Sequence, residues 1–168
     1  MNSRHMESRS TTVKLVYIAT LIAISFIGSL IKIQGTIALD SMAGFFAALF
    51  LGPISGALVG SIGHLLTAVT SGFPLTLPIH LIITLQMAVF VYIFGRIYEK
   101  TNEVIACTVG IILNGIVSVL MLAPVTIWVG FPLSGKSFIY AMAGPLTLAS
   151  AVNIILASVI YKVIKDRI

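Results

Sequence analysis

The stretch GFFAALFLGPISGALVGSIGHLLTA, residues 44–68, contains two apolar segments joined by the Gly-Pro pair at residues 52–53. Proline disfavours a helical conformation in the residue before it and suits the first turn of a helix. The stretch therefore predicts a tight helical hairpin. Small residues recur at every fourth position and lead to a histidine: Gly52, Gly56, Gly60 and His64. This spacing permits a close approach between helix backbones.

The whole chain shares this apolar character. Of its 168 residues, 58% are hydrophobic and 9% are charged, and the mean hydropathy is +1.12, whereas soluble domains carry about 25% charged residues. The chain is therefore predicted to be an integral membrane protein. Its net charge of +5 comes from basic residues at the ends of apolar segments, not from a basic run, which indicates membrane topology and not nucleic-acid binding.

Six apolar segments are separated by polar, Gly or Pro breaks, and a membrane-spanning helix needs about 20 residues. We predict an all-α protein whose six transmembrane helices form one compact bundle. The predicted spans are 12–31, 38–52, 54–71, 77–98, 103–127 and 138–164. The second and third are short for a full crossing. Residues 12–168 are interpreted as one domain after a tail, residues 1–11, whose opening MNSRHM resembles a cloning remnant.

Basic residues predict the orientation in the membrane. Eight of the ten Lys and Arg residues fall on the side of the termini, and Lys32 and Lys136 fall on the other. By the positive-inside rule, both termini are expected in the cytoplasm. The loops near 32–38, 72–77 and 128–137 are then extracellular.

Residues 130–137, GFPLSGKS, match the spacing of a phosphate-binding loop. Such a loop follows a strand, but the preceding segment is typical of a membrane helix, no acidic residue is placed to hold magnesium, and ATP lies on the opposite side. We interpret the match as false and predict no enzymatic activity. The loop shares Gly-Phe-Pro-Leu with residues 72–76, GFPLT. The repeated segment is either an interfacial turn or a turn that also contacts a ligand.

Several polar side chains remain within or beside the predicted spans, where each needs a partner or lines a cavity. Helical spacing gives four helices a polar stripe, and these stripes can converge on an outward-opening pocket. The candidates for substrate contact are Asp40, His64, His80, Thr84, Asn114 and Asn153. Two alternatives stay open: Asp40 as the N-cap of the following helix, and the two histidines as hydrogen-bond partners between helices.

Aromatic residues cluster with a lysine around the last outer loop. The further candidates there are Trp128, Phe131, Lys136 and Tyr140. They either contact a flat ligand or belong to the aromatic belt at the membrane surface. Because no His-Glu-x-x-His motif or close His/Cys cluster occurs, the sequence predicts no metal site, and no cofactor is expected.

The six spans, the basic start, the Ala19-x-x-x-Ala23 pattern and the hairpin at 44–68 together resemble the substrate-binding S components of energy-coupling factor (ECF) vitamin transporters. The resemblance implies a bundle in the bacterial cell membrane that captures a vitamin or vitamin precursor in a pocket near the outer face. It also implies docking on a membrane T component driven by two cytoplasmic ATPase subunits. Ala19 and Ala23 would face the T component.

The run from Ser41 to His80 resembles S components assigned to cobalamin-precursor salvage, which makes α-ribazole the best candidate ligand. Its benzimidazole would stack on Trp128 or a loop phenylalanine. Pantothenate, pyridoxine-type compounds, thiamine precursors and queuosine precursors remain open. Two other classes also fit the residues: a stand-alone secondary carrier or channel for a small polar solute, with His64 as its deep titratable group, and an intramembrane enzyme using Asp40, His64 and His80.

Overall fold

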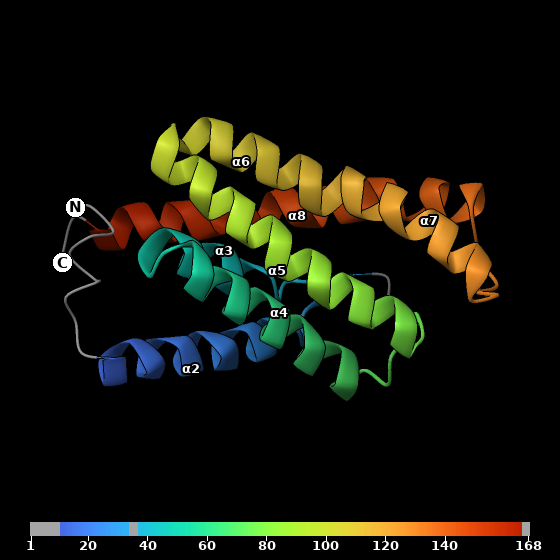
Figure 1. The fold of residues 1–168 in the computed structure, drawn as a ribbon, viewed down its shortest axis with the longest axis horizontal. Coiled ribbons are helices and arrows are strands. Elements are labelled where there is room, and N and C mark those ends of the chain that lie inside the picture. The colour runs from blue at the N-terminus through green and yellow to red at the C-terminus, as the bar shows by residue number, and fades with distance from the viewer. Residues whose placement is uncertain (1–10, 34–36, 166–168) are drawn as a thin grey trace.

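A computed structural model describes residues 11–33 and 37–165 of the chain. Helices form nearly all of this part, and Figure 1 shows them as an elongated bundle. The described elements are α2 (Thr11–Gly28), β1 (Lys32–Ile33), β2 (Ile37–Ala38), α3 (Met42–Phe50), α4 (Pro53–Thr70), α5 (Leu77–Lys100), α6 (Glu103–Ile111), the π-helical turn η1 (Ile112–Val117), α7 (Ser118–Trp128) and α8 (Lys136–Lys165). The predicted all-α class is confirmed.

Within the described residues, five helices are long and apolar enough to cross a membrane: α2, α4, α5, the continuous helix α6–η1–α7, and α8. Their ends lie within three residues of the predicted spans. The span predicted at 38–52 differs, since α3 has only nine residues. At 1.5 Å per residue it is about 14 Å long, about half of the hydrocarbon core. Asp40 and Ser41 stand before it in a turn, where short polar side chains are favoured over a helix interior.

The hairpin predicted at the Gly-Pro pair is present between α3 and α4. Gly52 has φ of 96°, a conformation that suits glycine, and Pro53 occupies the first turn of α4. A Cβ added to Gly56 would lie 2.5 Å from the Cβ of Ala48, and one added to Gly44 would lie 2.7 Å from the Cα of Gly60. The two helices therefore pack backbone against backbone because their facing residues are small.

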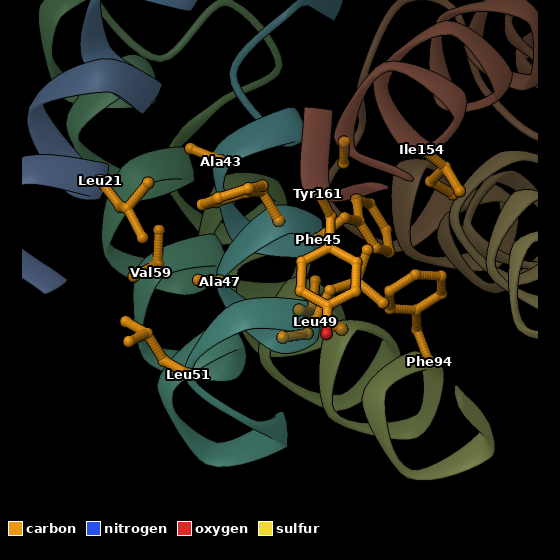
Figure 2. Close-up of a cluster of buried hydrophobic side chains, with 14 of the residues drawn as sticks. Leu21, Ala43, Phe45, Ala47, Leu49, Leu51, Val59, Phe94, Ile154 and Tyr161 are labelled. Carbon is orange, nitrogen blue, oxygen red and sulfur yellow. The ribbon is translucent and has the colours of Figure 1, made fainter. Parts of the chain in front are cut away.

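Helix α3 occupies the centre of the bundle, in contact with α2, α4, α5 and α8. Its side chains form one cluster with residues of those helices (Figure 2). Phe45 is fully buried and packs edge-to-face on Phe94 of α5, with ring centroids 5.0 Å apart. Ile154 and Tyr161 close the cluster from α8. The short helix is therefore part of the hydrophobic core, and the long helices pack around it.

The outer surface of the bundle is apolar, and much of the buried part is polar. Leu85 and Val104, for example, are 66% and 74% exposed, whereas Ser150 is fully buried and Asn153 nearly so. Soluble proteins show the opposite preference. Polar groups inside and apolar groups outside are expected of helices surrounded by lipid.

The two ends of the bundle differ. In Figure 1, the beginning of α2, the end of α8 and the α5–α6 connection lie at one end, and the α4–α5 and α7–α8 connections lie at the other. At the first end, Glu103 accepts a hydrogen bond from Ser158 and pairs with Lys162 at 3.0 Å, so α6 is tied to α8. Apart from Thr11, the tail predicted at residues 1–11 lies outside the described residues.

Candidate functional site

A cavity, partly open at the surface of the protein, lies among β2, the start of α3, and helices α4, α5, η1–α7 and α8. Eight lining residues are polar: Asp40, Ser41, His64, His80, Asn114, Ser118, Ser150 and Asn153. The others are apolar: Ile37, Ala38, Leu75, Ile83, Met87, Leu122, Phe138, Met142, Leu146 and Ala149. The cavity therefore offers hydrogen-bonding groups beside a large apolar surface.

Three titratable side chains form a chain along the cavity. The Oδ2 atom of Asp40 lies 3.7 Å from Nδ1 of His64. The Nε2 atom of His64 lies 3.3 Å from Nδ1 of His80, and the two rings stack with centroids 5.4 Å apart. The backbone N–H of Leu75 donates to Nε2 of His80 at 3.3 Å. This row connects the β2–α3 segment, α4, α5 and the α4–α5 loop.

The hydrogen-bond directions assign the tautomers of both histidines. Because Nε2 of His80 accepts from Leu75, a neutral His80 carries its proton on Nδ1, which faces His64. Nε2 of His64 then accepts, so a neutral His64 carries its proton on Nδ1, which faces Asp40. All donors in the row point toward the carboxylate of Asp40. The arrangement stabilises an ionised Asp40 without a charged histidine.

His80 holds the α4–α5 loop on the cavity. Besides the bond from Leu75, the ring of Phe73 lies 5.9 Å from the His80 ring. The loop backbone has positive φ at Gly72, Phe73 and Thr76, of 73°, 53° and 76°. Positive φ is unfavourable for a β-branched residue such as threonine, so contacts with the rest of the protein have to maintain this conformation.

We expect His80→Leu to release this loop. Without its acceptor, the Leu75 N–H loses a hydrogen bond that contributes about 1 kcal/mol, which corresponds to roughly fivefold faster amide exchange. Hydrogen exchange followed by mass spectrometry on peptides covering residues 71–76 measures the change. His64→Leu is the matched control, because it leaves the Leu75 bond in place. Equal exchange in the two variants would contradict the anchoring role of His80.

Asn114 enters the cavity from the π-helical turn η1. Its Nδ2 donates to Oγ of Ser150 on α8 at 2.9 Å, while its Oδ1 has no partner among the described residues. At the next position, a Cβ on Gly115 would lie 2.8 Å from the Cα of Thr147, so η1 and α8 are in close contact here. π-Helical turns within α-helices are frequent at functional sites. This one leaves a free amide oxygen at the cavity.

Asn153, by contrast, is bound to backbone on both amide atoms. Its Oδ1 accepts from the N–H of Met42 at 2.9 Å, and its Nδ2 donates to the carbonyls of Ala149 at 2.9 Å and Ala38 at 3.4 Å. The side chain is 1% exposed. Asn153 therefore fixes the segment from Ala38 to Met42, which carries Asp40, against α8.

Comparison with protein families identifies the chain at this point. The model of the family described as ECF transporter, substrate-specific component matches residues 13–165. The chain belongs to this family. A comparison with curated proteins and one with solved structures found no match. As an S component, the protein is a multi-pass membrane protein that binds a small-molecule substrate for transport and works with T and ATPase components. S components are not enzymes, so the family does not support the enzyme alternative.

The structure brings together half of the predicted contact residues of this S component. Asp40, His64, His80, Asn114 and Asn153 all line the cavity. The other five do not line it: Thr84, Trp128, Phe131, Lys136 and Tyr140. Thr84 donates to the carbonyl of His80 within α5, and Trp128 and Tyr140 are 82% and 83% exposed. Their positions next to the α7–α8 loop do not place them at the cavity.

The two alternatives for the titratable residues have different outcomes. The N-cap of α3 is Ser41, so the N-cap interpretation of Asp40 is wrong, and its carboxylate faces His64 instead. The interhelical interpretation of His64 and His80 is confirmed by their contact between α4 and α5. That contact is compatible with a place at the cavity, since both side chains also line it.

The two Gly-Phe-Pro-Leu loops also differ. Leu75 of the first loop lines the cavity, whereas no residue from 130 to 136 does. The second loop is bound to Thr126 instead, whose Oγ1 accepts from the N–H of Gly135 at 3.1 Å and whose carbonyl accepts from Phe131 at 2.9 Å. The second loop follows helix α7. Because a phosphate-binding loop follows a strand, this position agrees with the interpretation of the motif match as false.

Sequence reasoning missed the apolar lining and Ser41. Phe138, Met142 and Leu146 belong to the lining of the α8 side, but apolar residues in a chain this apolar carry no signal of their own. Their spacing of four residues, which leads on to Ser150, was the available signal, since it places them on one face of α8. No group of three His, Cys, Asp or Glu side chains suited to a metal occurs among the described residues. The absence of a metal site stays a prediction.

Proposed function

We propose that this S component captures a vitamin or vitamin precursor from outside the cell in the cavity formed by β2, α3, α4, α5, η1–α7 and α8. The observation that carries the proposal is the convergence of polar side chains from separate elements on one cavity. Polar groups inside a membrane protein are costly and mark binding sites. We keep Asp40, His64, His80 and Asn114 as substrate contacts, and assign Asn153 the role of positioning the Asp40 segment.

The proposed orientation has both termini in the cytoplasm and six passages of the chain through the bundle. The second passage would combine the segment before α3 with α3 itself. Support comes from the basic residues at the end of the bundle where α2 begins and α8 ends, which are Lys14, Arg96, Lys100, Lys162 and Lys165. The positive-inside rule supports a cytoplasmic position for that end. His80 lies near the start of α5, at the other end of the bundle, which supports a cavity toward the outer face.

The proposed contact with the T component uses α2. Ala19 and Ala23 are both exposed on this helix, which buries only Leu21 and Ser25. Small residues four apart allow another helix to approach closely. The exposed patch supports docking there for ATP-driven uptake, with hydrolysis performed by the partner ATPase subunits.

α-Ribazole is the specific ligand that we propose. Its flat benzimidazole would lie against Phe138 and Met142, and its ribose hydroxyls would reach Asp40 and Asn114. Trp128 lies outside the cavity and has no part in this arrangement. The ring therefore has an apolar surface available without the outer-loop aromatic residues.

Calorimetry on the purified protein tests the ligand. We expect α-ribazole to bind, and both Asp40→Ala and Asn114→Ala to weaken binding at least tenfold, because each removes a hydrogen bond to the ligand. Trp128→Ala is the control and should leave the affinity unchanged. An unchanged affinity in both cavity variants would contradict the proposed contacts.

Reconstitution in liposomes separates an S component from the alternative of a stand-alone secondary carrier or channel. The protein alone should bind the ligand without moving it across the membrane. Uptake should appear only when T and ATPase components and ATP are added. Uptake of the ligand by the protein alone would contradict this mode of transport.

A further inference from the structure

We infer that the cavity selects an uncharged or cationic nitrogen heterocycle that carries hydrogen-bond donors, that it excludes carboxylated and phosphorylated ligands, and that Asp40 determines this selectivity. The inference rests on the proposed binding role of the cavity and narrows its substrate class. Three observations carry it: the charges of the lining, the order of protons along the histidines, and the hydrogen-bonding atoms left for a ligand.

The first observation is the charge of the lining. Among the lining residues whose side chains the structure describes, Asp40 is the only aspartate or glutamate, and none is lysine or arginine. Lys136, the lysine that the sequence placed among the loop aromatic residues, does not line the cavity. Proteins bind carboxylates and phosphates with such cations or with free amides at helix N-termini.

Among the described residues, the helix start at the cavity, that of α3, carries a negative charge of its own. The start of α3 faces the cavity through Ser41. The N–H of Met42, however, already donates to Asn153, and Asp40 supplies a negative charge at the same place. An anionic ligand here would meet a carboxylate of the same sign in surroundings where charges are weakly screened.

The second observation concerns the histidines, which do not supply a net positive charge either. Both ring nitrogens of His80 are in use, and Nε2 is an acceptor, so the hydrogen bond from Leu75 requires this ring to be neutral. A proton added to Nε2 of His64 would face the Nδ1–H of His80 at 3.3 Å, donor against donor. Even a charged His64 would only neutralise Asp40. The net charge of the row is therefore negative or zero.

The third observation is the set of atoms that a ligand can use. The Oδ1 of Asn114 and the carboxylate of Asp40 are acceptors, and the hydroxyl of Ser150, which accepts from Asn114, still has its hydrogen to donate. Phe138 and Met142 add apolar surface. A ligand that matches this set brings two or more donors, one acceptor and a flat apolar ring. Neutral hydroxylated or protonated nitrogen heterocycles fit, and pantothenate, a carboxylate, does not.

Matched pairs of ligands that differ only in a phosphate test the inference. Calorimetry on the purified full chain would compare α-ribazole, pyridoxine and thiamine with their phosphate esters, and include pantothenate as a carboxylate. We expect at least one unphosphorylated compound to bind, with its phosphate ester at least 100-fold weaker. Asp40→Asn should weaken binding of the preferred compound at least tenfold and reduce the discrimination against its ester to less than tenfold.

Each outcome has a distinct meaning. Binding of a phosphate ester or of pantothenate as tight as that of the preferred compound would overturn the charge selectivity alone and leave the proposed binding role intact. An unchanged discrimination ratio in folded Asp40→Asn would overturn the role of Asp40. The wild-type ratio tests the selectivity without any variant. Absence of binding by every compound, charged or uncharged, would overturn the proposed site and this inference with it.

Discussion

Gly56→Leu is expected to destabilise the protein by about 3 kcal/mol or more, the upper range for overpacking a tight core. The added Cβ would lie 2.5 Å from the Cβ and 2.7 Å from the Cα of Ala48, so α3 and α4 would have to separate. Helix α3 cannot move away, because it is in contact with α2, α5 and α8 as well. Heating the purified variant in detergent and following the loss of monodisperse protein by size exclusion measures the effect.

Gly144→Leu is the matched control for this prediction. Gly144 lies exposed in α8, and a Cβ placed there would have no heavy atom within 4 Å other than those of its two chain neighbours and of the backbone of its own helix. The same change of residue should therefore shift stability by less than about 0.5 kcal/mol, as surface substitutions usually do. Equal melting midpoints for the two variants would show that α3 and α4 do not pack as closely as described.

Asn153→Ala is expected to have the largest effect on ligand binding, a loss of at least 100-fold, together with about 2–4 kcal/mol of stability. The substitution leaves the N–H of Met42 and the carbonyl of Ala38 without their side-chain partner, and each unsatisfied buried group costs about 1–3 kcal/mol. Asp40 lies between these two residues, so the segment that carries it would lose its position. Calorimetry with the bound ligand and thermal unfolding in detergent measure the two effects.

Asn114→Ala separates positioning from direct contact. Asn114 has one protein bond, to Ser150, and its free oxygen faces the cavity. Its loss should lower affinity while the melting midpoint stays close to that of the wild type. The positioning role of Asn153 would be contradicted if Asn153→Ala matched Asn114→Ala in both affinity and midpoint.

The long helices were predictable because the bilayer imposes a length and an apolar composition on each span. The Gly-Pro pair at 52–53 likewise determined where α4 begins. The length of α3 was not predictable in this way. Its apolar sequence is equally typical of a span and of a buried core helix, and only its contacts with four other helices show that it is core. A short apolar run does not distinguish the two.

The site residues within the membrane spans were predictable, because polar side chains are rare there. The candidates near the polar loops were not reliable. Asp40, His64, His80 and Asn114 were identified because polar side chains within the membrane are costly and usually functional. All four line one cavity. Trp128 and Tyr140 were chosen by their nearness to a loop in sequence, which does not tell on which face of a helix a side chain lies. Both belong to the exposed surface of the bundle.

The central position of α3 has a consequence for how the fold is specified. Seven of its nine residues are buried, so protein and not lipid surrounds the helix on nearly every side. Lipid tails are as apolar as the side chains of α3, and hydrophobicity therefore gives no preference for the centre of the bundle. Shape complementarity has to provide that preference. In this hairpin, the smallest residues, the glycines and alanines at the α3–α4 contact, determine which helix packs against α3.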